Sequence, residues 1–282
     1  MWQPVVFCFS VTSKQQQHHD HALAPHVKVL EEHDIKIQIP YIIDSTTHVV
    51  SSKRNVPKGL QALINGRYIV KDGFVDAVVA AVTPRNGGQS DGHGLTPLEE
   101  DFDGNWPDAS KFLPPAGNEP VPRPPELFAP NYERIHIFNG YTFIFADRSQ
   151  YENLGDALTN GGAKTKLFEL ELGRTTVSEV AAFVKEAAGE EGTGELETAG
   201  QGKGVVFVRF RGRGDTAEWA LAFLRNVDAT LGQRSVEQNE FLDAILYNDA
   251  STLRRPLLDA ETEDATARPP DASELAYITS CI

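Results

Sequence analysis

Sulfur is scarce in this sequence of 282 residues, which contains two cysteines and one methionine. The cysteines, Cys8 and Cys281, lie at opposite ends of the chain. Two cysteines so far apart do not suggest a disulfide framework, and they indicate a reducing compartment. No run of about 18 apolar residues occurs, which argues against a transmembrane helix. The short apolar start, residues 1–9, is followed by polar residues and no small-residue cleavage site, so we expect no signal peptide.

Positive charge is also in short supply. The chain has 26 lysines and arginines against 40 aspartates and glutamates, for a net charge of −14. Binding to DNA phosphates depends on lysine and arginine, so this balance argues against a surface built mainly for DNA, although one local basic site remains compatible with it. Much of the acid falls in segments that resemble a linker and a tail, namely Glu99, Glu100, Asp101, Asp103, Asp108, Asp259, Glu261, Glu263 and Asp264.

Sequence signatures of common enzyme classes are missing. Residues 200–204 (GQGKG) lack the spacing and the hydroxyl of a P-loop, and there is no H-E-x-x-H motif and no pair of C-x-x-C motifs. The run His18, His19, Asp20 and His21 could suggest a metal site, but adjacent side chains diverge and rarely converge on one ion. We interpret it as a solvated insertion, and we expect no enzymatic activity, metal or cofactor.

What the sequence does contain is a repeated alternation of short strands and helices. The β-branched run 46–50 predicts a strand. Pro57 then suits the start of a helix, because its fixed φ and missing N–H cost nothing at the first helical position. Gly66 suits the left-handed end of that helix. A further strand at 68–70 and a helix at 71–81 continue the order.

The same pattern predicts the rest of the fold. Two more strands, 5–9 and 36–39, with a helix between them that ends near His33, give the first 82 residues four strands and three helices. Strands linked by helices form parallel sheets with right-handed crossovers. From residue 134 the order repeats, with strands at 142–146, 166–168, 205–210 and 233–236 and helices at 149–158, 177–188, 216–231 and 237–247. The chain is therefore predicted to hold two copies of one fold.

Between the copies, residues 83–133 are rich in glycine and proline, which predicts a linker with little regular structure. Its apolar side chains are too many for a free tether, so we expect parts of it to pack on the domains; they are Trp106, Phe112, Leu113, Leu127, Phe128 and Tyr132. After Asp249 the chain is polar and acidic, which predicts disorder. The predicted boundaries are 1–82 and 134–250 for the domains, 83–133 for the linker and 251–282 for the tail.

Two basic features are candidates for binding. Lys58 lies in the first turn of its helix, where a cation is unfavourable by ~0.3–1 kcal/mol. It is either an exposed, solvated lysine or, together with the helix N-terminus, part of an anion site. Arg209, Arg211 and Arg213 follow a predicted strand. This patch could contact nucleic acid, but a turn with solvated arginines is the simpler interpretation.

These residues also resemble a known family. The strand 47–50 (THVV), the lysine that opens the next helix, the turn 65–67 (NGR) and the strand 69–71 (IVK) are similar to those of BRCT domains. Residues 138–145 resemble the opening strand of the second BRCT domain in regulatory subunits of double-strand-break repair nucleases, and the helix around Trp219 resembles its later part. The resemblance covers roughly residues 4–249.

The resemblance implies an α/β fold of two BRCT domains in tandem, each a small four-stranded parallel sheet flanked by helices. One position departs from the family. Phe74 stands where BRCT domains commonly carry a tryptophan in the last helix. Phenylalanine can fill the same core position, so the expected fold is unchanged.

The resemblance also points to phosphate binding. A phosphoserine carries about −1.5 to −2 charges and strong acceptor oxygens, which suit a cation, a hydroxyl and a backbone N–H. By resemblance, Lys58 binds the phosphate and Ser10 supplies the hydroxyl; the fold brings Ser10 and the N–H of Val11 near Lys58. BRCT pairs often have glycine at the position of Val11, and this bulkier residue could obstruct the peptide. Thr12 is then the alternative hydroxyl, and Ser10 would be satisfied within its own loop.

Specificity beyond the phosphate is expected at the junction of the two domains. In family pairs, the side chain three residues after the phosphoserine enters a groove between the domains. Here that groove would involve the helix of Lys58 and the first and last helices of the second domain. Asn55 lies where some pairs hold the peptide, and Arg54 is a neighbour that could assist.

The sequence therefore predicts a non-enzymatic, nuclear module of double-strand-break repair, the damage checkpoint and telomere maintenance that binds phosphoserine peptides. Expected partners are phosphorylated chromatin or damage-response proteins and the break-repair nuclease complex, with neither a membrane nor direct DNA binding. The alternative is a phosphate-independent structural adaptor in which Lys58 is merely solvated; a small α/β enzyme is a third hypothesis. Relatives also carry an FHA domain and C-terminal nuclease-binding motifs. Neither is evident, so we expect a fragment, a truncated gene model or a short member.

Overall fold

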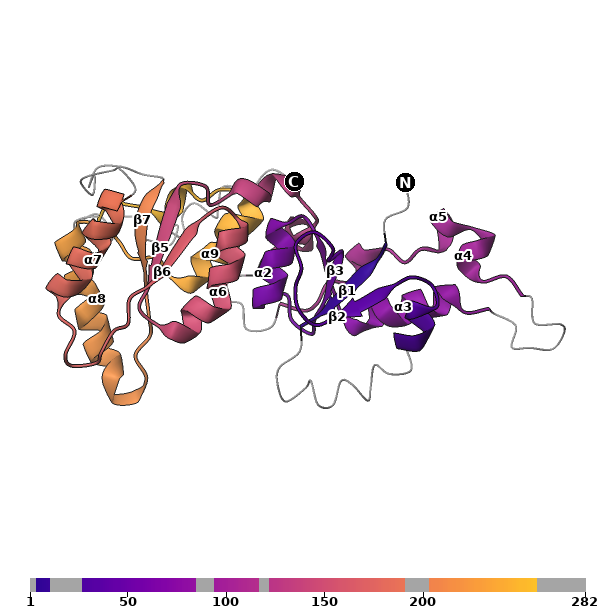
Figure 1. Ribbon diagram of the computed structural model, residues 1–282, viewed down its shortest axis with the longest axis horizontal. Helices are drawn as coiled ribbons and strands as arrows, with labels where there is room; N and C mark the ends of the chain where they lie inside the picture. The colour runs from indigo at the N-terminus through magenta and orange to yellow at the C-terminus, as the bar shows by residue number, and fades with distance from the viewer. Residues whose placement is uncertain (1–3, 11–26, 85–93, 117–121, 191–202, 258–282) are drawn as a thin grey trace, which may run out of the picture.

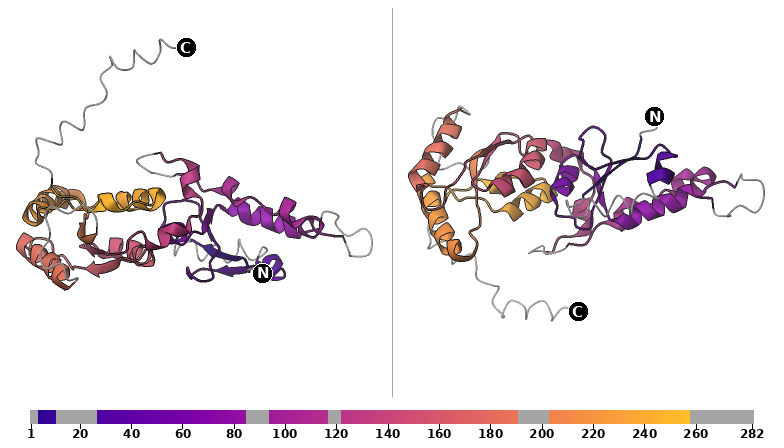
Figure 2. Two further views of the ribbon diagram at one scale, coloured as in Figure 1. Left: turned by 90° about the horizontal axis from the view of Figure 1, so that it is seen from above. Right: turned by 60° about the horizontal axis from the view of Figure 1, so that its bottom comes forward.

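The computed structural model describes residues 4–10, 27–84, 94–116, 122–190 and 203–257. Two α/β domains follow one another along the long axis of the molecule (Figure 1). Each is built on a parallel sheet with helices on both faces, as the strand–helix alternation predicts. The two further views show the same side-by-side arrangement (Figure 2).

The first sheet has the four parallel strands that the sequence predicts. They are β1 (Val6–Phe9), β2 (Lys36–Gln38), β3 (His48–Val50) and β4 (Tyr68–Val70), in the order β2-β1-β3-β4. Two helices follow β3 and β4, namely α2 (Pro57–Ile64) and α3 (Asp72–Val82), and residues 27–31 are also helical. Pro57 starts α2, and Gly66 has a φ of +62° just beyond it, so both local predictions are confirmed.

Successive side chains of β1 point to opposite faces of this sheet, as the pleat requires. Phe7 and Phe9 pack with α3, whereas Cys8 packs with α2. Phe74 of α3 has no exposed surface and contacts Phe7 edge to face, with ring centroids 6.0 Å apart. Phenylalanine thus fills this core position, as expected.

The second sheet has three strands, β5 (Tyr141–Phe145), β6 (Lys164–Leu167) and β7 (Gly204–Val208), in the order β6-β5-β7. The predicted fourth strand, 233–236, is reduced to a single parallel bridge between Val208 and Val236. A short connection separates the end of α8 at Leu231 from the start of α9 at Gln238, and within it Gln233 pairs antiparallel with Pro256.

Four helices cover the second sheet. They are α6 (Arg148–Asn160), α7 (Val177–Glu190), α8 (Ala217–Leu231) and α9 (Gln238–Tyr247). Buried side chains of α6 and α9 pack on one face, and those of α7 and α8 on the other. Thr176 and Glu179 exchange hydrogen bonds at the start of α7, which confirms the predicted capping box.

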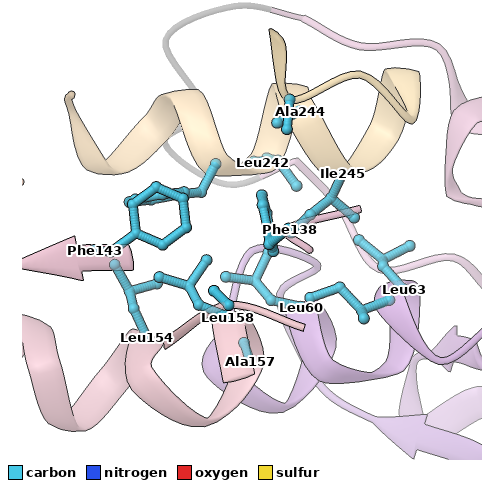
Figure 3. Close-up of a cluster of buried hydrophobic side chains, with 14 of the residues drawn as sticks. Leu60, Leu63, Phe138, Phe143, Leu154, Ala157, Leu158, Leu242, Ala244 and Ile245 are labelled. Carbon is cyan, nitrogen blue, oxygen red and sulfur yellow. The ribbon is translucent and has the colours of Figure 1, made fainter. Parts of the chain in front are cut away.

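The two domains share one hydrophobic core at their junction. Helix α2 packs against α6 and α9, and a continuous buried cluster runs from the first sheet through these helices to the second sheet. Leu60 and Leu63 of α2 lie among side chains of α6 and α9, including Leu158 and Ile245 (Figure 3). The three helices expected to border the peptide groove do pack together, and the groove itself stays a prediction.

The linker is folded onto both domains, as its apolar content predicts. It contains five single-turn elements among the described residues, which are α4 (Pro97–Glu100), α5 (Phe102–Asn105), η1 (Ala109–Phe112), η2 (Pro125–Phe128) and η3 (Tyr132–His136). Phe128 is buried in the junction cluster. Phe112 contacts Phe74, and its carbonyl accepts a hydrogen bond from the N–H of Lys71.

Buried arginines fasten the linker to the second domain. Arg123 pairs with Asp243 of α9, Nε to Oδ1 at 2.6 Å. Arg134 donates to the carbonyls of Leu127 and Ala129 in the linker and, at 3.3 Å, to that of Leu246 in α9. Because a buried guanidinium needs acceptors, these contacts specify the path of the linker.

The predicted disorder after Asp249 is wrong for residues 251–257. A short helix, η5 (Ser251–Leu253), forms there, and Leu253 is buried in the junction cluster. Arg254 donates to Gln233 Oε1 and to the carbonyl of Lys203. The prediction failed because one apolar and one hydrogen-bonding side chain outweigh the polar composition around them. Residues 258–282, like the histidine run 18–21, lie outside the described residues.

The described residues contain neither a candidate membrane span nor a candidate metal cluster. None of the helices there combines the length and the apolar character needed to cross a membrane. Within the same residues, no cluster of three or more histidine, cysteine, aspartate or glutamate side chains is arranged to hold a metal ion.

Candidate phosphate-binding site

The ammonium group of Lys58 lies at the carboxyl ends of two adjacent strands. Nζ donates to the carbonyl of Phe9, the last residue of β1, at 2.8 Å. It also donates to the carbonyl of Ile39, just after β2, at 2.6 Å. Lys58 therefore does not extend freely into solvent, and the first turn of α2 is held against the edge of the sheet.

Ser10 reaches the same edge. It follows Phe9 directly, so the carbonyl that binds Lys58 belongs to the peptide unit that joins Phe9 to Ser10. The N–H of Ser10 donates to the carbonyl of Val50 at 2.8 Å and is used within the sheet. Val11 and Thr12 lie outside the described residues. Their N–H and hydroxyl stay predictions.

Burial shapes the chemistry around Lys58. Partial burial lowers the pKa of its ammonium group, and the neighbouring Cys8 opposes this shift. Burial raises the pKa of Cys8 to about 11, so this residue is a neutral thiol at physiological pH. Its Sγ contacts the Ile39 carbonyl at 3.3 Å. An ammonium group has three N–H donors, so two acceptors from the described residues leave one donor for a ligand.

The N-terminus of α2 adds donors of its own. Val56 occupies the N-cap without a side-chain hydrogen bond, and the first turn contains no acid. Among described helices of eight residues or more, α2 alone has neither a capping side chain nor an acidic residue in the first turn. Unsatisfied N–H groups and the helix dipole favour an anion at such an end.

The structure separates Arg54 from Asn55. Arg54 is only 5% exposed, and its guanidinium carbon lies 4.3 Å from the ring centre of Phe128 in the linker. Asn55 is exposed in the loop before α2. Arg54 thus has a packing role between the first domain and the linker, whereas Asn55 is accessible. A peptide contact by either residue stays a prediction.

In the second domain, acidic residues occupy the positions that correspond to the loop after β1 and to Lys58. The loop after β5 contains Asp147, whose carboxylate caps α6 through the N–H of Gln150. Helix α8 follows β7 as α2 follows β3, and its second residue is Glu218 where α2 has Lys58. This asymmetry favours the first domain as the anion site.

The predicted arginine patch is largely neutralised. Arg209 Nη2 lies 3.0 Å from Oδ2 of the buried Asp228, and Arg209 Nε donates to Ser235 Oγ. Arg209 and Arg211 also each lie 3.8 Å from a carboxylate oxygen of Glu237. Arg209 is therefore a structural residue and not a solvated one, which corrects the simpler interpretation at that position, whereas the exposed side chain of Arg211 agrees with it.

Sequence reasoning missed the two carbonyls that hold Lys58. Backbone acceptors have no residue signature, so only the register of β1 and β2 against α2 reveals them. It also missed the stacking of Arg54 on Phe128. The one available signal was the apolar excess of the linker, which predicted packing but not its partner.

Comparisons with known proteins address the second domain most directly. Residues 132–256 match the family model of the second BRCT domain on Nijmegen syndrome breakage protein. Nibrin from Mus musculus is 27% identical over 125 residues, which are 44% of this chain and 14% of nibrin. The chain therefore matches only a small part of the length of that relative.

Three solved structures are also similar to large parts of the chain, at low sequence identity. The S. pombe Nbs1–Ctp1 complex matches 89% of this chain and 59% of its own chain, at 13% identity and a TM-score of 0.39. In the complex of Rtt107p with a phosphorylated histone, the match covers 88% of this chain and 90% of the Rtt107p structure's chain, at 14% identity and a TM-score of 0.43. For Rad4 BRCT1,2 with a Crb2 phosphopeptide, the match covers 79% of this chain and 83% of the other, at 11% identity and a TM-score of 0.23.

Proposed function

We propose, from the premise that this chain is a nibrin-like pair of BRCT domains, that it binds phosphoserine peptides in double-strand-break repair and checkpoint signalling. The observation that carries the proposal is the position of the Lys58 ammonium group. It lies at the carboxyl ends of β1 and β2, beside the peptide unit of Ser10 and at an uncapped helix N-terminus.

The proposed pocket combines three kinds of donor. Lys58 supplies positive charge as a point donor. The first turn of α2 supplies backbone N–H groups, and Ser10 supplies a hydroxyl, with Thr12 as the alternative and the N–H of Val11 beside it. A phosphate with three acceptor oxygens and about −1.5 to −2 charges can use all of them at once.

Residues after the phosphoserine would be read at the domain junction. Helix α2 carries Lys58 at one end and packs on α6 and α9 along its length. A peptide that leaves the phosphate pocket along α2 would therefore reach the second domain. The exposed Asn55 is the proposed contact for the peptide backbone, with Arg54 as a supporting neighbour.

The proposed partners are phosphorylated chromatin or damage-response proteins in the nucleus, and the break-repair nuclease complex. The resemblance to nibrin supports these assignments for a non-enzymatic regulatory module. The net charge of −14 supports the further proposal that the chain does not bind DNA directly.

A second candidate is a phosphate-independent adaptor. It is favoured by the fact that two backbone carbonyls already bind the Lys58 ammonium group. A lysine satisfied in this way could serve only to fasten α2 to the sheet. The pair of domains would then bind an unphosphorylated protein surface.

An oriented library of phosphoserine peptides separates the two candidates. We expect the wild type to select phosphoserine peptides over the matched serine library. Lys58→Met should weaken binding of a selected peptide by the ~1.5–3 kcal/mol of a charge-assisted hydrogen bond, roughly tenfold to more than a hundredfold. Ser10→Ala should weaken it less. Selection that is indifferent to phosphate would favour the adaptor.

A further inference from the structure

Lys58 lies at the carboxyl ends of the strands of the first sheet, and a concave surface lies at their opposite, amino ends. Because the four strands of this sheet are parallel, their amino ends gather at one edge and their carboxyl ends at the opposite edge. A groove of about 830 Å³ at the amino edge is lined by residues at or just before the starts of three strands, which are Val5, His48 and Tyr68. Helices α4 and α5 of the linker form the facing wall. We call this surface the amino-edge groove.

The groove has apolar side chains that the fold leaves uncovered. Phe102 of α5 is 51% exposed and stacks on the half-buried Trp106, with ring centroids 5.6 Å apart and planes 22° apart. Tyr68 is 41% exposed and stacks on His48. Grouped aromatic rings at a concave surface are typical of interaction sites rather than of scattered surface residues.

The charges around the groove have one sign. Glu99, Asp103 and Asp108 line it, and no lysine or arginine occurs among the described residues that do. Hydrogen bonds from Thr96 and from Ser110 lower the pKa values of Glu99 and Asp108. Both carboxyl groups therefore carry charge at neutral pH.

Nearby basic groups include His33 and His48 in the lining, and Arg67 and Lys111 outside it. Burial lowers the pKa of His48 to about 4, so this ring is neutral at neutral pH. His33, in the turn before β2, places its Nε2 3.1 Å from the carbonyl of Val82. Lys111 is exposed and lies 3.7 Å from Asp108, outside the lining. Exposed ion pairs of this kind are weak. A ligand would thus meet aromatic rings inside an acidic rim.

We propose that the amino-edge groove docks a peptide segment of a partner protein in which large apolar side chains stand beside lysine or arginine. The apolar side chains would pack on Phe102, Trp106 and Tyr68, and the basic ones would pair with the acidic rim. This ligand is opposite in charge to a phosphopeptide. Helices α4 and α5 lie at the end of the molecule far from the second domain (Figure 1, Figure 2), so both ligands can bind together.

Selection from phage-displayed random peptides tests this proposal. Displayed peptides carry no phosphoserine, so the Lys58 site does not contribute. Selected peptides are then synthesised and measured by fluorescence anisotropy with the groove variants Phe102→Ala and Asp103→Lys. Leu172→Ala and Glu186→Lys make comparable changes, from a large apolar residue to alanine and from an acid to lysine, at exposed positions of the second domain and serve as controls.

We expect enriched peptides to combine basic and large apolar residues. Each groove variant should weaken their binding about tenfold, as loss of an anchor residue does, while the control variants keep the wild-type affinity. Failure to enrich, enrichment of acidic peptides, or equal binding by all four variants would overturn the proposal. So would a wild-type dimer that Phe102→Ala converts to monomer, because the occupant would then be a second copy of the chain.

Discussion

At the scale of single residues, His48 shows how the first core constrains a titratable group. Its ring lies between Tyr68 and Phe74, with centroids at 5.2 and 5.0 Å, and only 7% of the residue is exposed. Burial, with a smaller contribution from Arg67, lowers its pKa to about 4. The imidazole therefore stays neutral in the folded protein well below the pH at which a free one is protonated.

This burial predicts a loss of stability in acid. The imidazole of the unfolded chain binds a proton as the pH falls below about 6.5, whereas that of the folded protein binds one only as the pH falls to about 4. The unfolded state binds more protons in that window, so the free energy of unfolding decreases as the pH falls. The effect is at most roughly 3 kcal/mol. Urea unfolding between pH 7 and 4 should show a smaller decrease for His48→Phe, and equal decreases would contradict the assignment.

At the scale of elements, α2 combines two demands on one short helix. Its first turn holds Lys58 against the first sheet, and its buried side packs on the second domain. Gly59 permits this placement. A Cβ there would lie 2.7 Å from the carbonyl oxygen of Arg54 and 3.2 Å from Val56 Cγ2.

Replacing this glycine tests the close approach. Gly→Ala usually stabilises a helix interior by about 1 kcal/mol. In Gly59→Ala the clash with backbone should dominate and lower the free energy of unfolding by roughly 1–2 kcal/mol. Gly155→Ala in α6 is the matched control, because its Cβ would meet nothing nearer than 3.8 Å. Denaturant unfolding should give opposite signs; stabilisation in both variants would contradict the account of α2.

The elements were predictable where side chains alone decide them. The β-branched run 46–50 predicted β3, and Pro57 and Gly66 predicted the two ends of α2. Local sterics set these boundaries. The fourth strand of the second sheet, residues 251–257 and the acceptors of Lys58 were not predictable. They depend on backbone groups and on neighbours far along the chain, such as Gln233 with Pro256. Lys58 was identified as a candidate by its position in the helix and by family resemblance, not by these contacts.

At the scale of the whole molecule, the junction makes the two domains one structural unit. The junction cluster includes side chains of both sheets and of α2, α6 and α9. The linker adds Phe128, and the buried Arg134 at the start of the second domain binds carbonyls of the linker and of α9 together. A tethered pair without this core would unfold in two steps.

Leu63 at the junction tests this unity. It has no exposed surface, and Leu63→Ala should reduce the free energy of unfolding by about 2–5 kcal/mol. The fluorescence of the three tryptophans and far-UV circular dichroism should still report one coincident transition. Leu221→Ala, at a 54% exposed position, should change stability by less than about 0.5 kcal/mol. Separate transitions in the wild type would show that the domains are independent.

The central claim is that Lys58 forms the phosphate pocket, and a matched peptide pair tests it most directly. The ratio of affinities for the phosphoserine and serine forms of one selected peptide is measured for wild type, Lys58→Met and Lys53→Met. Lys53 is an exposed lysine in the preceding loop, so its loss removes the same charge nearby. We predict that Lys58→Met reduces the ratio roughly tenfold or more and that Lys53→Met leaves it nearly unchanged. A ratio near one in the wild type, or equal reductions in both variants, would contradict the account.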